Sequence, residues 1–314
     1  MNSTCLCVWK QVTALTLILF SLQVVAQYPA LPVVQWTPRS DWVNVKSDPA
    51  LTIHATGNGI TDDFAAIQQA LDLVSTSAEK SVVYLPAGTY RITQTLGWLT
   101  GDNCIRGRSL YGCGSQTTVF WDGTTGGTMF LSTGNAKARY KGVVWDGRNS
   151  AAYGMYFQPR FEVNPSQGFA EAPMLHDNQA FLNFTNVGLN FCNRSNTEWT
   201  GEVQVRNCLF YNCKYGSQIG KDYYNNYEYI FESCHFQDCQ TGIDAAKNSS
   251  QMVYACRFEN STVVDITGES SIRARHCISS GSKLFFTTIS LSFSTRMYFS
   301  FALKYSSILS SFFK

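Results

Sequence analysis

Charge is scarce in this sequence. The 314 residues include 24 Lys and Arg against 22 Asp and Glu, so the formal net charge is only +2. Without a run of basic residues, the sequence offers no surface for nucleic acid or for an acidic membrane. Pairs of the Cys-x-x-Cys type are also absent, which argues against a zinc site of the ribbon type. We therefore expect no nucleic-acid partner, no bound metal and no other cofactor.

A hydrophobic run long enough to span a bilayer is missing as well. The most apolar stretch, Val12–Leu22, covers 11 residues, whereas a transmembrane helix needs roughly 20. It follows Lys10 and precedes small residues that end at Ala26, which is the arrangement of a secretory signal peptide. We predict that residues 1–26 are a signal peptide and that the mature protein is secreted, extracellular and free of the membrane. Four sequons beyond residue 26 favour a glycoprotein: Asn183, Asn193, Asn248 and Asn260.

A repeat runs through the second half of the sequence. Four cysteines, spaced by 26, 22 and 21 residues, each begin a similar phrase: Cys208, Cys234, Cys256 and Cys277. In the first three phrases a Phe follows the Cys by two positions, and an Asn or Asp follows it by four. Such a period is typical of a solenoid, with Phe pointing inward and Asn or Asp forming a turn. We predict an all-β fold, a parallel β-helix in which Cys stacks on Cys, either as disulfides or as buried thiols.

The segments outside the repeat complete the expected organisation. Apolar residues at helical spacing predict an amphipathic capping helix over about residues 61–75, covering the first rung. Residues 27–41 are expected to form an extended lead-in, and residues 42–281 the β-helix. The last segment, 282–314, is rich in Ser and Phe and lacks turn residues, so we expect it to lie outside the native fold.

Two segments near the N-terminus resemble a known family. The runs GNGITDDFAAIQQALDLV (residues 57–74) and VVYLPAGTYRIT (residues 82–93) are similar to the N-terminal signature of the pectate lyase superfamily, in the branch of rhamnogalacturonases and phage tailspikes. Asn58 stands where that signature usually has Asp. The resemblance implies a right-handed parallel β-helix with an N-terminal helical cap and an extracellular carbohydrate as substrate. It also implies calcium if the protein is a lyase. The family's catalytic clusters do not occur in this sequence, so its catalytic residues are not transferred.

Candidate site residues therefore come from the repeat. Aligning the rungs places Gln218 beside Asp244 and puts Lys221, Lys247 and Glu269 in one column. Such a column could bind a sugar or exchange protons with it. A solvated outer edge with weak ion pairing explains the same column.

A second pair of candidates begins another rung. His176 titrates near neutral pH, and the adjacent Asp177 could orient its ring. The alternative is a structural surface histidine without a catalytic role. The candidate catalytic residues are then His176, Asp177, Asp244, Lys247 and Glu269.

Three functions remain open on the sequence. The leading hypothesis is a secreted carbohydrate-active protein, a glycoside hydrolase or polysaccharide lyase whose partner is an extracellular polysaccharide. The alternatives are a non-catalytic β-helix that binds glycans or serves as a structural element, and an incomplete product that lacks rungs and hydrolytic activity. No feature of the sequence indicates an oligomeric state.

Overall fold

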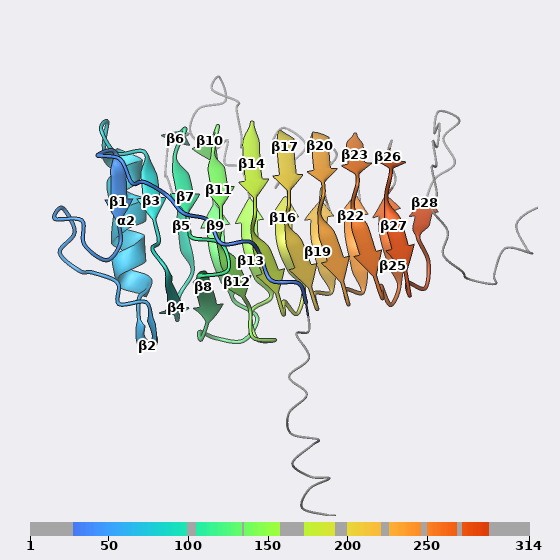
Figure 1. Cartoon of the computed structure of the whole chain (residues 1–314), viewed down its shortest axis with the longest axis horizontal. Coiled ribbons are helices and arrows are strands. Elements are labelled where there is room, and N and C mark those ends of the chain that lie inside the picture. The colour runs from blue at the N-terminus through green and yellow to red at the C-terminus, as the bar shows by residue number, and fades with distance from the viewer. Residues whose placement is uncertain are drawn as a thin grey trace, which may run out of the picture. The chain divides into compact units, whose positions relative to one another are not determined.

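The described part of the chain folds into a parallel β-helix with one helix, α2 (Phe64–Thr76), at its N-terminal end (Figure 1). The computed structural model describes residues 28–98, 105–133, 135–157, 173–191, 200–220, 226–245, 250–268 and 272–288. Leu31–Lys314 clusters as one compact unit. Within it, successive rungs lie side by side from β1 to β28, and each complete rung contributes one strand to each of three parallel sheets.

The three sheets hold the strands in the order of the rungs. Sheet 1 has nine strands: β1 (Trp42–Asn44), β3 (Val82–Tyr84), β7 (Ser109–Tyr111), β11 (Arg139–Lys141), β14 (Met174–Asp177), β17 (Thr200–Arg206), β20 (Asn226–Glu232), β23 (Gln251–Tyr254) and β26 (Ile272–Arg275). Sheet 2 has nine: β2 (Asn58–Asp62), β4 (Gly88–Ile92), β8 (Thr117–Trp121), β12 (Val144–Asp146), β15 (Ala180–Leu182), β18 (Leu209–Tyr211), β21 (His235–Gln237), β24 (Arg257–Glu259) and β27 (Ile278–Ser280). Sheet 3 has eight: β5 (Leu96–Trp98), β9 (Thr128–Ser132), β13 (Tyr153–Phe157), β16 (Val187–Phe191), β19 (Tyr215–Ile219), β22 (Thr241–Ala245), β25 (Val264–Gly268) and β28 (Phe286–Thr288). A small pair joins β6 (Ile105–Arg106) to β10 (Asn135–Ala136).

The predicted phenylalanine column is confirmed in sheet 2. Phe210, Phe236 and Phe258 are paired in register on neighbouring strands and fully buried. Their rings stack almost in parallel, with centroids 4.6 and 4.9 Å apart. Each strand of this column lies one strand spacing from the preceding one. The inner position therefore has the same surroundings on each of these rungs, and the same side chain fills it.

The predicted turn column is confirmed as well. Asn212, Asp238, Asn260 and Gly281 all adopt left-handed backbone conformations, with φ between 51° and 68°. Asn and Gly tolerate this region better than other residues, and Asp does so by bonding locally. Asn260 Nδ2 also donates to Asp238 Oδ1 at 3.0 Å, so the corner residues bond from rung to rung.

The cysteines of the repeat form a ladder of thiols. Every cysteine that the structure describes is free, and the leading ones stack at the corner between sheets 1 and 2. Cys234 Sγ, for example, donates to the backbone oxygen of Val205 at 3.3 Å and is almost fully buried. Of the two alternatives, buried thiols are therefore the one observed. Burial raises the pKa of the Cys234 thiol well above its usual value through desolvation.

Helix α2 (Phe64–Thr76) lies where the sequence places a capping helix, and it packs against β5 at the N-terminal end of the stack (Figure 1). Its buried face includes Ile67 and Leu71, and Trp98 Nε1 of β5 donates to Leu71 O at 3.3 Å. The helix starts later than predicted. Asp63, at the N-cap position, instead accepts hydrogen bonds from the backbone N–H groups of Thr56 and Gly57, at 2.6 and 3.1 Å.

The β-helix begins with β1 at Trp42 as expected, whereas its C-terminal end differs from the expected boundary. The lead-in is held by an antiparallel bridge between Val33 and Gly114, and a Cβ at Gly114 would lie only 1.9 Å from Pro32 O. Beyond residue 281, the expected end of the β-helix was wrong: Phe286 pairs with Ile266 in register and adds β28 to sheet 3. The first part of the segment 282–314 thus continues the inner column, while residues 289–314 lie outside the described residues.

Candidate functional site

His176 lies in the interior of the β-helix, not on its surface as predicted. Its side chain is fully buried in β14, and its ring stacks on Tyr140 with centroids 5.0 Å apart. The edges of Phe157 and Phe191 close the site at 5.1 and 5.7 Å. Burial lowers the pKa of His176 to about 3, so the ring is neutral at physiological pH.

A short chain of hydrogen bonds fixes this imidazole. Trp145 Nε1 donates to Gln179 Oε1 at 3.0 Å, and Gln179 Nε2 lies 3.0 Å from His176 Nδ1. Because an amide nitrogen only donates, Nδ1 must accept, and the ring proton lies on Nε2. The group is a polar element of the core, without access to an external substrate.

Asp177 does not orient His176, because consecutive residues of a strand point to opposite faces of the sheet. The Asp177 carboxylate lies on the outer face of sheet 1, where its Oδ2 is 3.4 Å from Lys141 Nζ and 3.5 Å from Arg206 Nη2. Its Oδ1 accepts from Asn207 Nδ2 at 3.1 Å. The predicted His176–Asp177 pair is therefore absent, and Asp177 belongs to a partly exposed ion-pair ladder.

The outer face of sheet 3 brings together a second set of polar residues, and this is our main candidate site. Gln218 and Asp244 are paired in register, and Gln218 Nε2 donates to Asp244 Oδ2 at 2.7 Å. Their predicted proximity is confirmed. The same outer position is Asn190 on the preceding rung and Thr267 on the next. We call Asn190, Gln218, Asp244 and Thr267 the polar column.

Two members of the polar column are buried although they face outward. Asn190 is 3% and Gln218 is 5% exposed. Asn190 Oδ1 has no hydrogen-bond partner in the described part of the chain, and such a buried acceptor is costly unless a ligand or water satisfies it. The column thus offers amide, carboxylate and hydroxyl groups, which are the groups that bind sugar hydroxyls.

Sequence reasoning found only part of this column. Lys221, Lys247 and Glu269 lie outside the described residues, so their place beside Asp244 stays a prediction. Asn190 was missed because the Cys repeat that carried the alignment begins only at Cys208. Extending the strand register by one rung toward the N-terminus would have found it.

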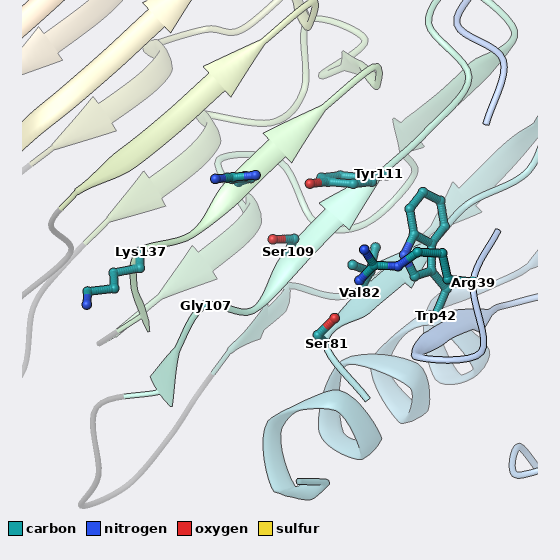
Figure 2. Close-up of a pocket in the computed structure, with 9 residues that line it drawn as sticks. Arg39, Trp42, Ser81, Val82, Gly107, Ser109, Tyr111 and Lys137 are labelled. Atoms are coloured by element: carbon teal, nitrogen blue, oxygen red, sulfur yellow. The ribbon is translucent and has the colours of Figure 1, made fainter. Parts of the chain in front are cut away.

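A pocket of about 290 Å³ lies elsewhere, on the outer face of sheet 1 (Figure 2). We call it the sheet-1 pocket. It is lined by Arg39, Trp42, Ser81, Val82, Gly107, Ser109, Tyr111, Lys137 and Arg139. The sequence showed no sign of it, because its residues come from the lead-in and from β1, β3, β7, β11 and the loops beside them, and none repeats with the rungs.

The described residues contain no group of three or more His, Cys, Asp or Glu side chains arranged to hold a metal ion. The calcium that a lyase of the resembling family would use therefore has no ligand set in this part of the chain, and we derive no step through it. None of the helices among the described residues is long and apolar enough to cross a membrane.

The sequence profile of the family described as rhamnogalacturonase A/epimerase, pectate lyase-like matches residues 42–266, well over half of the chain. No curated protein matches the sequence significantly. Among solved structures, Pantoea stewartii WceF, described as a glycan biofilm modifying enzyme with a bacteriophage tailspike-like parallel β-helix fold, is similar with a TM-score of 0.50 at 12% identity. This similarity covers 74% of the chain and only 36% of WceF.

A second similar structure is the A-module of the Azotobacter vinelandii mannuronan C-5 epimerase AlgE6. Its TM-score is 0.39 at 16% identity, over 74% of this chain and 73% of the module. At such low identity, the likeness to WceF shows the parallel β-helix fold alone.

Proposed function

The chain belongs to the rhamnogalacturonase A/epimerase, pectate lyase-like family, and from this premise we propose that it is a secreted protein that acts on an extracellular polysaccharide. Family membership supports a carbohydrate-active role on a β-helix scaffold. Secretion is supported by the signal-like segment before Gln27 and by the sequons. The reaction, hydrolysis or elimination, is the part that experiment has to assign.

The polysaccharide binds, in this proposal, along the outer face of sheet 3. The observation that carries it is the bonded pair of Gln218 and Asp244, next to Asn190 with its buried, unpartnered acceptor. An acid–base group must be held in position to work, and the Gln218 bond holds the Asp244 carboxylate. Thr267, which is partly exposed, would bind a sugar hydroxyl on the next rung.

A second function, binding without cleavage, is favoured by one observation. On the described strands of sheet 3, Asp244 is the single carboxylate that faces outward, because Asp265 is fully buried. Glycosidases use a pair of carboxyl groups. Glu269, predicted beside Asp244, would supply the second one if the first function holds.

The test is an assay of the secreted protein on a panel of polysaccharides, following new reducing ends and the ultraviolet absorbance of unsaturated uronates. Reducing ends with that absorbance assign a lyase, and reducing ends without it assign a hydrolase. Asp244→Asn should abolish turnover while leaving the melting temperature unchanged. Asp72→Asn, on the exposed face of α2, is the matched control and should retain full turnover.

The outcomes separate the two functions. If the parent protein binds a polysaccharide but does not cleave it, the binding function is supported. If the protein neither binds nor cleaves any of the polysaccharides, both proposed functions are contradicted.

A further inference from the structure

The sheet-1 pocket is rich in hydrogen-bond donors that have no acceptor. Arg139 lines it, and within the described residues its guanidinium has neither an ion pair nor a hydrogen bond. Lys137 is likewise unpaired at the rim, on a left-handed backbone with φ of 57°. Both side chains are exposed, so their donors are available to an acceptor from outside the chain.

Two hydroxyl groups, from residues that are otherwise mostly buried, also line the pocket. Ser109 is 5% and Tyr111 is 9% exposed, and neither hydroxyl has a hydrogen-bond partner among the described residues. Figure 2 shows both hydroxyls pointing in the same direction from β7. Because a hydroxyl group can donate a hydrogen bond, both groups are placed to donate to a ligand with oxygen acceptors in the pocket.

A third cation is held over the same pocket. Arg39 Nε and Nη2 donate to the two carboxylate oxygens of Asp41, at 2.9 and 2.7 Å. Ser81 Oγ also donates to Asp41, and these bonds, that of Arg39 above all, lower the pKa of the carboxyl to about 2. Asp41 therefore stays ionised and fixes the guanidinium, whose Nη1 remains available to a ligand.

Aromatic rings give the pocket a rigid wall. Trp42 packs edge-on against Tyr111 with centroids 5.2 Å apart, and Trp36 stacks on the Tyr111 ring at 5.0 Å. The volume of about 290 Å³ lies just below the roughly 300–1,000 Å³ of most ligand pockets. This is room for about one ring-sized group, with an apolar side against the wall and acceptors toward the donors.

We propose that the sheet-1 pocket binds an anionic sugar residue, through its carboxylate or sulfate group, as a site separate from the polar column of sheet 3. Arg139 binds the anionic group in a forked geometry, Ser109 and Tyr111 donate to it, and Arg39 adds a further contact. This assignment rests on the proposed function, because it specifies which glycan the protein retains.

The experiment measures equilibrium binding of three short oligosaccharides to the secreted protein by calorimetry. One carries uronic acids, the second is the same oligosaccharide after carboxyl reduction, and the third is neutral but sulfated. We expect one of the charged forms to bind at least about tenfold more tightly than the reduced form, with an affinity that falls as salt rises. Preference for the uronate or for the sulfated form identifies which anion is recognised.

Variants with a matched control locate the binding site. Arg139→Met should weaken binding of the preferred charged form about tenfold or more, and Ser109→Ala should weaken it less. Arg273→Met is the control, because Arg273 is exposed at the same outer position of sheet 1, in β26, far along the column from the pocket. It removes the same charge and should leave binding unchanged.

Three results would overturn the assignment: equal binding of the charged and reduced oligosaccharides, no binding of any of them, or an equal loss in Arg139→Met and Arg273→Met. Asp244→Asn distinguishes this site from the polar column. If the sheet-3 proposal fails, Asp244→Asn has no effect on turnover, and the effect of Arg139→Met on oligosaccharide binding remains. If the sheet-1 proposal fails, Arg139→Met has no effect on oligosaccharide binding, and the effect of Asp244→Asn on turnover remains.

Discussion

The inner columns and the outer faces of this β-helix follow opposite rules. Inside sheet 2, three successive rungs carry Phe210, Phe236 and Phe258, stacked at nearly constant spacing. Outside sheet 1, three successive rungs carry Lys141, Asp177 and Arg206, which differ in charge from one to the next. This inner position of sheet 2 repeats because each of these rungs must fill the same closed space. Outer positions vary because water accepts any of them, so ligand sites can arise there.

The largest effect should come from placing a charge in the inner column. Phe236→Asp removes a fully buried ring, which costs about 3–5 kcal/mol, and adds a carboxylate without a partner. Against a typical total stability of about 5–15 kcal/mol, this should unfold much of the solenoid. Thermal unfolding followed by circular dichroism measures the loss.

The control for that variant lies on an outer face. Met252 in β23 is 41% exposed, so Met252→Asp places the same side chain where water solvates it. We expect a change within about 0.5 kcal/mol. Equal losses in Phe236→Asp and Met252→Asp would break the distinction between inner and outer positions.

The next effect concerns the buried histidine and depends on pH. In the unfolded chain His176 binds a proton below about pH 6.5, whereas burial lowers the pKa of the folded group to about 3. Between these values the unfolded state binds more protons, so the stability contributed by this group falls as pH falls, by about 1.4 kcal/mol per pH unit.

Urea unfolding between pH 7 and pH 5 tests this expectation. His176→Phe should flatten the profile, although it leaves Gln179 Nε2 without its acceptor and costs about 1 kcal/mol at neutral pH. His54→Gln, at an exposed histidine, should keep the parent's slope. A His176→Phe profile as steep as the parent's would place the acid sensitivity elsewhere.

Much of the fold could be predicted from the sequence, and the reason is its periodicity. Phe236 and Asn212 were assigned correctly because the inner column and the left-handed corner demand the same chemistry on each rung. Phe286 was missed because it continues a sheet-3 column of Ile243 and Ile266, which the Cys phrases do not mark.

The candidate sites were predicted far less well, for the opposite reason. Gln218 and Asp244 were brought together by the repeat. Arg39 and Arg139, by contrast, are distant in sequence, and no period relates them. His176 was placed on the surface because the inner column of sheet 1 has no repeating residue type. Its neighbour in that column, Tyr140, is a different residue, so the sequence does not mark the position as interior.

A smaller effect is expected at the corner column, between the inside and the outside. Gly281 has φ of 68°, and a Cβ there would lie 2.2 Å from Asn260 Oδ1. Gly281→Ala should therefore add a clash to a left-handed strain of about 1–2 kcal/mol. Gly126, with φ of 83° and no atom within 4 Å of a Cβ, isolates the strain. Melting temperatures that fall equally in Gly281→Ala and Gly126→Ala would show that Asn260 moves aside without cost.

The smallest effect belongs to the ion-pair ladder on the outer face of sheet 1. Asp177→Asn removes the negative charge between Lys141 and Arg206 but keeps an oxygen for the bond from Asn207. Because these groups are partly exposed, the loss should be about 0.5–1 kcal/mol in urea unfolding and should shrink as salt rises. A loss of several kcal/mol that does not change with salt would mean that Asp177 is as constrained as an inner residue. Solvation by water would then not explain why the residues at outer positions vary from rung to rung.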